Sequence, residues 1–533
     1  MSASEVSLPL AHVKGLPLDT ANVLLPADYP NTYAARTPDR IALQFEGHRH
    51  SYAGLDRVVG QMAAVLREAG VVAGSRFAIL AKNSDLFYIA LMAAGRVGAV
   101  IVPINWRNTA SEVRYVLEDA GVGLAIVETA FLPVFDEADR AGLPRLLLDG
   151  DGPDGLRALI AAAEPAPREP HDPKTPWLQL YTSGTTGRPK GVVTTQFAFA
   201  AQREMEHVSG HFDDWRDDEV LLSALPAFHI GGMTWAFTGL CRGLTSIVTN
   251  DASPAGLVDQ CLAHNITRTF IVPTLVRGMI GELDARGVAI PTLRGIQYGA
   301  ASMDPALLDR SVDRIGCAFL QYYGMTEITG TMSILGPKGH DSARPVLLRS
   351  VGQVLPGFEI QIRGPDRALL PIDTPGEIWC KGPSLLLEYW NKPEATAEAL
   401  IDGWYRTGDG GRLDAEGYLF ITDRIKDMIV SGGENVYPAE VEAALRDHPA
   451  VQDVAVFGLP HPKWGEGVTA AIELKPGQTA TQDELIAYAR TCLAAYKIPR
   501  RIEIGVLLPR TASGKVQRGM IRKTYLDAET TAA

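Results

Sequence analysis

Short apolar runs separated by helical sequence constrain the fold of this chain most strongly. In the first part of the chain these runs lie at residues 77–80, 99–104 and 124–127. Before them, apolar side chains recur at helical spacing from Leu55 to Leu66, and Gly70 follows as a helix-ending residue. Apolar runs flanked in this way are typical of buried parallel strands in βα units. We therefore expect a layered α/β fold.

Farther along, the same pattern returns and then changes. After about residue 350, Phe358, Ile360 and Ile362 alternate with polar residues, which indicates a half-buried strand. The strands after this point lie among Gly and Pro turns, so we expect a compact β subdomain there. The strands expected from both stretches are 246–249, 269–272, 295–298, 376–381 and 418–421.

From residue 427 to the end the sequence predicts a small α+β unit. A helix is expected at 439–446, and strands at 454–458 and 468–474. A later helix begins with the capping pair Thr481 and Glu484. Its apolar face is expected to carry Leu485, Tyr488, Cys492 and Tyr496.

The length and the charge of the chain limit the classes of function that are possible. The chain has 533 residues, which exceeds a typical single domain, so we expect at least two domains. Hydrophobic residues make up 46% and charged residues 21%, as in ordinary globular proteins. The net charge of −12 gives no general attraction to nucleic acid or to an anionic membrane. An anionic ligand must therefore be held by local cations.

Cysteine usage and hydropathy indicate a soluble, cytoplasmic protein. The five cysteines are scattered without CxxC spacing, which argues against a disulfide framework or zinc site and favours small buried thiols. The longest uncharged run, 221–241, contains Pro226, His229 and three glycines, so a buried segment lining a site is expected rather than a transmembrane helix. A secretory signal is not expected at the N-terminus. The oligomeric state stays open, with a homodimer as one option.

The strongest local signal is the segment 181–191, which reads Tyr-Thr-Ser-Gly-Thr-Thr-Gly-Arg-Pro-Lys-Gly. Its three glycines allow backbone N–H groups to approach an anion, its four hydroxyls supply donors, and Lys190 adds positive charge. It is not a Walker A sequence, because no Gly-Lys-Ser/Thr follows the spacer. We predict a phosphate-binding loop, with a flexible polar loop as the alternative. The predicted ligands are Thr182, Ser183, Gly184, Thr185, Thr186, Gly187 and Lys190.

Seven further motifs follow this loop in order. They are Pro-Ala-Phe-His-Ile-Gly-Gly at 226–232, Tyr-Gly-Ala-Ala at 298–301, Gln-Tyr-Tyr-Gly-Met-Thr-Glu at 321–327, Tyr-Arg-Thr-Gly-Asp at 405–409, Asp-Arg-Ile-Lys-Asp at 423–427, Ser-Gly-Gly-Glu-Asn-Val-Tyr-Pro at 431–438 and Pro-Arg-Thr-Ala-Ser-Gly-Lys at 509–515. The ordered set resembles the acyl-adenylate-forming superfamily of acyl- and aryl-CoA synthetases, peptide-synthetase adenylation domains and luciferases. The resemblance extends over nearly the whole chain, and the motif sequences are most similar to those of fatty-acyl-CoA synthetases of the FadD type.

The resemblance implies a fold and a set of co-substrates. The expected fold is α/β, with a large N-terminal domain over 1–424 that holds two βα-layered subdomains and a small β-barrel. A smaller, mobile α+β C-terminal domain is expected over 425–533. The implied reaction uses ATP, CoA and Mg²⁺ to activate a carboxylic acid to acyl-AMP with release of pyrophosphate, and then transfers the acyl group to CoA.

The first half-reaction brings together two anions, so its barrier is largely electrostatic and orientational. By resemblance, Lys515 bridges the carboxylate and the α-phosphate. Glu327, which follows Thr326, is the acid associated with Mg²⁺, which would neutralise the phosphates. Asp409 matches the carboxylate that accepts hydrogen bonds from the ribose hydroxyls, and Arg424 matches the neighbouring cation. Taken alone, each of these residues would be interpreted as a surface charge. The assignment therefore depends on the ordered set of motifs.

Other motif residues complete the expected nucleotide site. By resemblance, Tyr323 stacks on adenine, although an aromatic residue here could equally belong to the core. The backbone of the 299–301 segment is expected to face the nucleotide and the acyl carboxylate. The remaining members of this set are Gly299, Ala300, Ala301, Gln321, Tyr322 and Gly324.

The second half-reaction needs a thiol to reach the adenylate. His229 matches the aromatic gate between the ATP side and the pantetheine tunnel, against the alternative of a core histidine. By resemblance, Lys426 stands at the family's hinge position, where one residue would absorb the dihedral change of a rotating C-terminal domain. The loop with Gly432 and Gly433 would then shape the tunnel. Trp464 is similar to a residue near the thiol donor, or else is a buried tryptophan after a turn.

Alternative functions fit the sequence less well. A peptide-synthetase adenylation unit is disfavoured because only a short tail follows Lys515 and no carrier segment is expected. A luciferase-like oxygenase shares the motifs, but nothing points to it specifically. A non-catalytic acyl-adenylate sensor would be expected to lack Lys515 or Glu327, and both are present. A stand-alone adenylating enzyme that does not use CoA stays possible.

The acyl pocket is expected to be lined by residues 232–240 and 326–335. These segments offer no evident cation or acid for a charged tail. A medium- or long-chain fatty acid fits, and an aromatic acid of the cinnamate or benzoate type is the alternative. The apolar side chains offered are Met233, Trp235, Phe237, Ile328, Met332 and Ile334.

Overall fold

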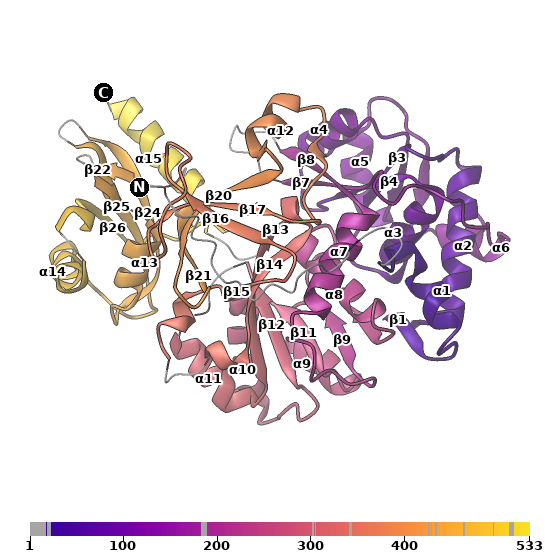
Figure 1. Cartoon of the computed structure of the whole chain (residues 1–533), viewed down its shortest axis with the longest axis horizontal. Helices are drawn as coiled ribbons and strands as arrows, with labels where there is room; N and C mark the ends of the chain where they lie inside the picture. Colours follow the sequence, from indigo (N-terminus) through magenta and orange to yellow (C-terminus); the bar gives the residue numbers. More distant parts are fainter. Residues whose placement is uncertain are drawn as a thin grey trace, which may run out of the picture. The chain divides into compact units, whose positions relative to one another are not determined.

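The computed structural model describes most of the chain (Figure 1). The described residues are 18, 23–182, 189–300, 303, 305–340, 344–424, 427, 429–431, 434–436, 438–461, 464–493, 495–510 and 516–532. Two compact units are found. The first combines Met1–Glu359 with Lys381–Tyr405, and the second combines Ile360–Cys380 with Arg406–Ala533. The predicted boundary at 424/425 stays a prediction.

A seven-stranded sheet in the first unit confirms the predicted βα pattern. Strand β3 runs parallel to both β4 and β5, as the three apolar runs predicted. At the other side, β7 and β8 form an antiparallel pair. In sheet order the strands are β18 (Glu388–Tyr389), β8 (Lys190–Thr195), β7 (Pro176–Thr182), β4 (Val100–Ile104), β3 (Arg76–Leu80), β5 (Leu124–Val127) and β6 (Arg145–Leu147).

A nine-stranded sheet completes the strand framework of the first unit. Its central strands β10, β9, β11, β12 and β13 are parallel neighbours, whereas β14 pairs antiparallel with β13. In sheet order the strands are β15 (Gln353–Val354), β14 (Gly330–Leu335), β13 (Ala318–Met325), β12 (Gly295–Gly299), β11 (Arg268–Ile271), β9 (Val220–Ser223), β10 (Thr245–Val248), β1 (Ile41–Phe45) and β2 (His48–Ser51).

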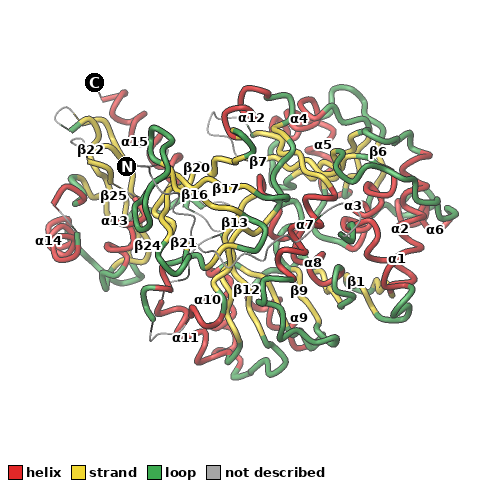
Figure 2. Tube along the Cα trace, viewed as in Figure 1, coloured by secondary structure: helices red, strands yellow, loops and turns green. Residues whose placement is uncertain are grey.

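Helices pack around the strands of this unit (Figure 2). None of the helices in the described part of the chain is both long and apolar enough to cross a membrane. They are α1 (Tyr29–Ala34), α2 (Tyr52–Glu68), α3 (Asp85–Val97), α4 (Ala110–Ala120), α5 (Leu132–Ala138), α6 (Leu156–Ala162), α7 (Gln196–His207), α8 (Ile230–Leu240), α9 (Pro254–Ala263), α10 (Pro273–Arg286), α11 (Pro305–Ile315) and α12 (Pro393–Ala399).

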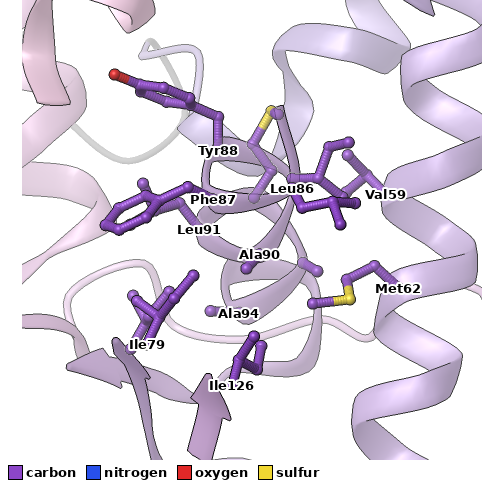
Figure 3. Packing of buried hydrophobic residues seen from close by; sticks show 14 of the residues in the cluster. Val59, Met62, Ile79, Leu86, Phe87, Tyr88, Ala90, Leu91, Ala94 and Ile126 are labelled. Atoms are coloured by element: carbon purple, nitrogen blue, oxygen red, sulfur yellow. The ribbon is translucent and has the colours of Figure 1, made fainter. Parts of the chain in front are cut away.

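Helix α3 forms the centre of the largest hydrophobic core. All of its residues are buried, because α2 covers one side and the sheet covers the other. Figure 3 shows its side chains between Met62 of α2 and Ile79 and Ile126 of β3 and β5. Ser84 caps the start of α3 by accepting a hydrogen bond from the Phe87 N–H, and Gly98 ends the helix in the left-handed conformation.

The described residues of the second unit form strands of two sheets and three α-helices. The predicted β subdomain corresponds to β16 (Glu359–Arg363), β17 (Gly376–Lys381), β20 (Trp404–Leu413) and β21 (Leu419–Arg424). Strand β19 (Leu400–Ile401) pairs with Trp404 and Tyr405, and these four residues belong to the first unit. The C-terminal α+β unit contains β22 (Ile429–Ser431), β23 (Glu434–Val436), β24 (Val451–His461), β25 (Gly465–Leu474) and β26 (Arg501–Ile504). Its helices are α13 (Pro438–Arg446), α14 (Gln482–Cys492) and α15 (Arg518–Ala532).

Helix α14 confirms the predicted capping box but corrects its predicted apolar face. The Thr481 side chain accepts a hydrogen bond from the Glu484 N–H, and the Glu484 carboxylate accepts one from the Thr481 backbone N–H. The helix ends at Cys492, because Leu493 takes an extended conformation. Tyr496 therefore lies in the following 3₁₀ turn, and Cys492 is exposed rather than buried. The buried face consists of Leu485 and Ala489.

A buried charge cluster fixes the start of α3. The Asp85 carboxylate is fully buried, with His50 Nε2 at 2.7 Å from Oδ2 and Arg157 Nη2 at 2.6 Å from Oδ1. Burial alone would raise the pKa of Asp85. The hydrogen bonds from His50 and Arg157 and their positive charge outweigh burial and lower the pKa to about 2.

We expect Asp85→Asn to destabilise the first unit by about 2 kcal/mol at neutral pH. A carboxylate whose pKa is lowered on folding stabilises the folded state at pH values above its unfolded-state pKa. That stability is lost as pH falls from the unfolded pKa of 3.8 toward about 2. Denaturant unfolding of both proteins from pH 7 to pH 3 measures the difference. The exposed Asp39→Asn serves as control, and a difference that does not shrink below about pH 4 contradicts the assignment.

Candidate active site

The predicted phosphate loop connects two paired strands. Thr182 is the last residue of β7 and Lys190 the first of β8, and the two residues are register partners. The predicted ligands Ser183, Gly184, Thr185, Thr186 and Gly187 lie outside the described residues. The hairpin therefore places the two ends of the loop side by side.

Glu327 lies against the end of this hairpin. It belongs to a 3₁₀ turn, Thr326–Ile328, which follows β13 directly. Its Oε1 accepts hydrogen bonds from Thr182 Oγ1 at 3.4 Å and from the Tyr389 hydroxyl at 3.2 Å. The Lys190 ammonium lies 4.9 Å from the centre of the Tyr389 ring. The structure thus brings together Glu327, Thr182 and Lys190, which the sequence analysis assigned to one phosphate site.

Tyr389 is a site residue that the sequence analysis missed. Burial, and then the negative charge of Glu327, raise the pKa of Tyr389 above its usual range, so its phenol stays protonated and donates. Its hydroxyl also lies 3.3 Å from that of Tyr405. Tyr405 opens the predicted Tyr-Arg-Thr-Gly-Asp motif, but Tyr389 reaches it only through the fold, so the sequence offers no signal for Tyr389.

A strained residue holds the Glu327 turn in place. Thr329 follows the turn with φ +59°, a left-handed conformation that a β-branched residue rarely adopts. Its hydroxyl donates to the Ser384 carbonyl at 2.8 Å and lies 2.8 Å from the Thr194 hydroxyl. Such strain costs on the order of 1–3 kcal/mol and clusters at functional sites. The two hydroxyl contacts from β8 and from Ser384 therefore keep Glu327 beside the loop.

The donor set around Glu327 fits a magnesium ion shared with a nucleotide. Mg²⁺ is commonly held by one or two carboxylates together with phosphate oxygens and waters. Glu327 offers one carboxylate next to the hydroxyl of Thr182. These residues suit that mode, with the phosphates completing the ligand set.

Two strands form the wall expected to face the nucleotide. Gly299 ends β12 opposite Tyr322 of β13, and a Cβ at Gly299 would lie 2.8 Å from the Tyr322 carbonyl oxygen. Ala300 follows with φ +64°, a second strained position in a predicted motif. Ala301 lies outside the described residues.

The neighbouring β13 residues have different environments. Tyr323 is partly buried and Gly324 is exposed. A Cβ at Gly324 would lie 1.8 Å from the Gly330 carbonyl oxygen, so the close approach of β13 and β14 requires glycine there. Gln321 is buried, and its Oε1 accepts a hydrogen bond from the Tyr298 hydroxyl at 3.2 Å. Gln321 therefore contacts the body of the sheet.

His229 stands at the N-terminus of α8. It is the N-cap residue, its ring centre lies 4.4 Å from that of Phe228, and part of its surface is exposed. Loss of water on its protein-facing side, and then the positive charge of Arg107, lower the pKa of His229 to about 4. The imidazole is consequently neutral at physiological pH.

The residues predicted for the acyl pocket lie on α8 and β14. Met233 and Met332 are fully buried, and Met233 belongs to the main core of the first unit. Trp235 is also buried; its Nε1 donates to the Leu222 carbonyl at 3.0 Å, and its ring contacts Phe270. Of the three, Trp235 contacts strands β9 and β11 of the nine-stranded sheet through Leu222 and Phe270.

The second unit carries the other predicted residues. Asp409 is almost fully buried in β20, and its backbone N–H donates to Thr407 Oγ1 at 3.0 Å. Arg424 is its register partner in β21. Trp464 is partly buried in the turn between β24 and β25, with the Arg500 guanidinium 4.3 Å from its ring centre. Five predicted site residues lie wholly or partly outside the described part of the structure. They are Lys426, Gly432, Gly433, Lys515 and, for its side chain, Arg424.

Comparison with known proteins defines the class. The family model described as AMP-binding enzyme matches residues 31–390, and the model described as AMP-binding enzyme C-terminal domain matches residues 440–515. The chain therefore belongs to the AMP-binding enzyme family.

Individual relatives agree with this assignment. The chain is 37% identical to a fatty acid–[acyl-carrier-protein] ligase, ScoC, of Streptomyces coeruleorubidus, over 92% of this chain and 95% of that protein. It is 36% identical to a feruloyl-CoA synthase of an Amycolatopsis species, over 93% and 98%. The solved structure of a Mycobacterium tuberculosis fatty acyl CoA synthetase matches with a TM-score of 0.76 at 31% identity, covering 95% of this chain and 99% of that one.

These matches confirm the resemblance to the acyl-adenylate-forming superfamily and the expected fold of a larger N-terminal and a smaller C-terminal domain. The chain is an enzyme of the AMP-forming acid–CoA ligase class. The relatives act on different acids according to their names, so the class leaves the acid unspecified.

We expect Glu327→Gln to lower kcat/KM for Mg²⁺-ATP at least about 100-fold, because the amide keeps the shape but removes the charge that would hold the ion. Pyrophosphate exchange at varied Mg²⁺ measures the effect, and thermal unfolding checks that the fold is intact. Glu394→Gln, at an exposed position in the first turn of α12, is the matched control. Equal activity of the two variants excludes Glu327 from the metal site.

Proposed function

We propose that this enzyme is an ATP-dependent acyl-CoA synthetase. It activates an organic acid to acyl-AMP with release of pyrophosphate, and then forms the CoA thioester with release of AMP. The observation that supports this most directly is the contact of Glu327 with Thr182 and Tyr389 at the end of the phosphate-loop hairpin. An acid at this place would repel phosphates unless a divalent cation lay between them.

In the first half-reaction, the protein has to offset the repulsion between carboxylate and triphosphate. Lys190 adds positive charge at the loop, and the glycines and hydroxyls of the loop supply donors to the phosphates. When bound at Glu327, Mg²⁺ would neutralise phosphate charge and favour departure of pyrophosphate. Lys515 would bridge the attacking carboxylate and the α-phosphate, while Asp409 and Arg424 bind the ribose side.

In the second half-reaction, the thiol has to reach the carbonyl of the adenylate. A neutral His229 can move aside without carrying a charge into the tunnel, because its pKa is about 4. Rotation about Lys426 would remove Lys515 and introduce the Gly432–Gly433 loop, with Trp464 near the thiol. We place this reaction in the cytoplasm.

For the acid, we propose a medium- or long-chain fatty acid, with an aryl acid of the cinnamate type as the alternative. The apolar side chains of α8 and β14 support a long apolar acyl group. The names of the relatives include a fatty-acid ligase and a feruloyl-CoA synthase, so both the fatty-acid class and the aryl-acid class agree with the relatives.

The proposal predicts that purified protein with Mg²⁺, ATP and a matching acid releases pyrophosphate, and that adding CoA yields thioester and AMP in equal amounts. A panel of saturated acids of increasing length, with benzoates and cinnamates, tests the acid class by pyrophosphate release. Formation of ADP, or adenylation without any CoA thioester, contradicts the assignment. Replacing CoA by a carrier protein with a phosphopantetheine thiol identifies the acceptor.

We expect Lys515→Ala to reduce adenylation by at least about 100-fold while leaving thioester formation from supplied acyl-AMP within a few-fold of wild type, because the lysine acts only before pyrophosphate leaves. The two half-reactions are measured separately, by pyrophosphate exchange and by CoA consumption. Lys523→Ala, at an exposed position in α15, is the control for loss of a lysine charge elsewhere in the C-terminal part of the chain. Equal loss in both half-reactions would remove Lys515 from its assigned role.

A further inference from the structure

A fully buried polar cluster lies beside the predicted acyl segments. Helix α7 contributes Gln202, Arg203 and Glu206, whose exposed fractions are 0%, 4% and 1%. Arg203 Nη1 donates to Thr238 Oγ1 of α8 at 2.5 Å, and Gln202 Nε2 donates to the Thr331 carbonyl of β14 at 3.2 Å. Helix α7 therefore joins the two segments that were expected to line the acyl pocket. It brings a cation, which neither segment carries, and an acid in addition to Glu327 of the second segment.

The charges of the cluster balance each other. Arg203 Nη1 lies 3.0 Å from Glu206 Oε2, and Gln202 Nε2 donates to Glu206 Oε1 at 3.1 Å. A balanced pair gives little net attraction to a charged tail, but it leaves a polar surface that can exchange hydrogen bonds.

Several polar atoms of the cluster lack a partner among the described residues. They are Gln202 Oε1, Arg203 Nε and the Tyr322 hydroxyl, all buried. Leaving a buried polar atom unpaired costs about 1–3 kcal/mol, so such atoms call for a ligand or an ordered water. Burial, and then the charge of Glu206, raise the pKa of Tyr322 well above its usual value, so its phenol is available to donate.

A row of aromatic rings connects this cluster to the nucleotide wall. The ring centre of Tyr322 lies 5.7 Å from that of Phe270, and Phe270 lies 6.0 Å from Trp235. Phe270 packs against both Gly299 and Gly231, where added Cβ atoms would lie 3.2 Å and 3.1 Å from its ring. Phe270 is the partly exposed residue of the otherwise buried strand β11. The row thus runs from the motif expected at the acyl carboxylate to the polar cluster.

We propose that the acid substrate carries a neutral oxygen, as a hydroxyl, phenol or keto group, on the part of its acyl group farthest from the carboxylate. Gln202 Oε1 would accept from a hydroxyl, and the Tyr322 hydroxyl and Arg203 Nε would donate to the oxygen. This inference rests on the proposed function and narrows its acid, whether the carbon skeleton is aliphatic or aromatic. A site built to bind an oxygen discriminates strongly against the analogue that lacks it, because its buried groups are then left unpaired.

The test uses acids in matched pairs with the same carbon skeleton. Saturated acids are compared with their terminal hydroxy derivatives, and cinnamate and phenylacetate with their 4-hydroxy derivatives. In the best skeleton, kcat/KM from pyrophosphate exchange is expected to favour the oxygenated acid at least about tenfold. If the plain acid equals or exceeds its partner in every pair, waters fill the cluster and this inference is wrong, while the proposed function stands. Preference for a terminal carboxylate over the hydroxyl also overturns it.

Two variants test whether a preference for the oxygenated acid comes from the polar cluster. Gln202→Met keeps the length of the side chain, and Tyr322→Phe removes only a hydroxyl. Each is expected to lower the ratio of kcat/KM between the two acids about tenfold, a readout that general loss of stability does not move. Gln61→Met is the matched control, because Gln61 is a buried glutamine of α2 that donates to the Ala163 carbonyl.

An unchanged ratio in both variants, or the same fall in Gln61→Met, contradicts the assignment. Absence of pyrophosphate release from wild-type protein with every acid contradicts the proposed function itself, and this inference with it. The two failures are therefore distinguishable.

Discussion

Repulsion between a carboxylate and the phosphates of ATP is the constraint on which this account depends. With a net charge of −12, the chain gives no overall help, so the compensation has to be local. We propose that one part of that compensation comes from Lys190 at the phosphate-loop hairpin and from Glu327, which contacts Thr182 and Tyr389 there. An acid placed among phosphate ligands makes chemical sense as the holder of a divalent cation.

The backbone around this site is strained where the chemistry needs fixed positions. Thr329 and Ala300, both non-glycine residues with left-handed φ, follow the Glu327 turn and the Gly299 wall. Thr329 is held there by its hydroxyl, which contacts the Thr194 hydroxyl of β8 and donates to the Ser384 carbonyl. A rigid first unit can thus present preorganised groups to the nucleotide, which is what electrostatic stabilisation of a transition state requires.

Much of the fold could be predicted because apolar runs and caps are local signals. The strands β3, β4 and β5 and the capping box of α14 follow directly from their own sequence. The contact of Glu327 with Tyr389 could not be predicted, because it depends on β18 meeting the site from a distant part of the chain. The same holds for Gln202, Arg203 and Glu206, whose polar spacing on α7 reads as a solvated face until the fold buries it. Tyr496 was misplaced because a single extended residue, Leu493, ends α14.

The most direct test of the central claim follows the carboxylate oxygen. An accepted acid labelled with oxygen-18 in its carboxyl group is turned over once with ATP and CoA, and the AMP and pyrophosphate are analysed by mass spectrometry. Attack of the carboxylate on the α-phosphate predicts that AMP gains one labelled oxygen while pyrophosphate gains none. Unlabelled AMP, or label in pyrophosphate or inorganic phosphate, would show that the acid is activated elsewhere on the nucleotide.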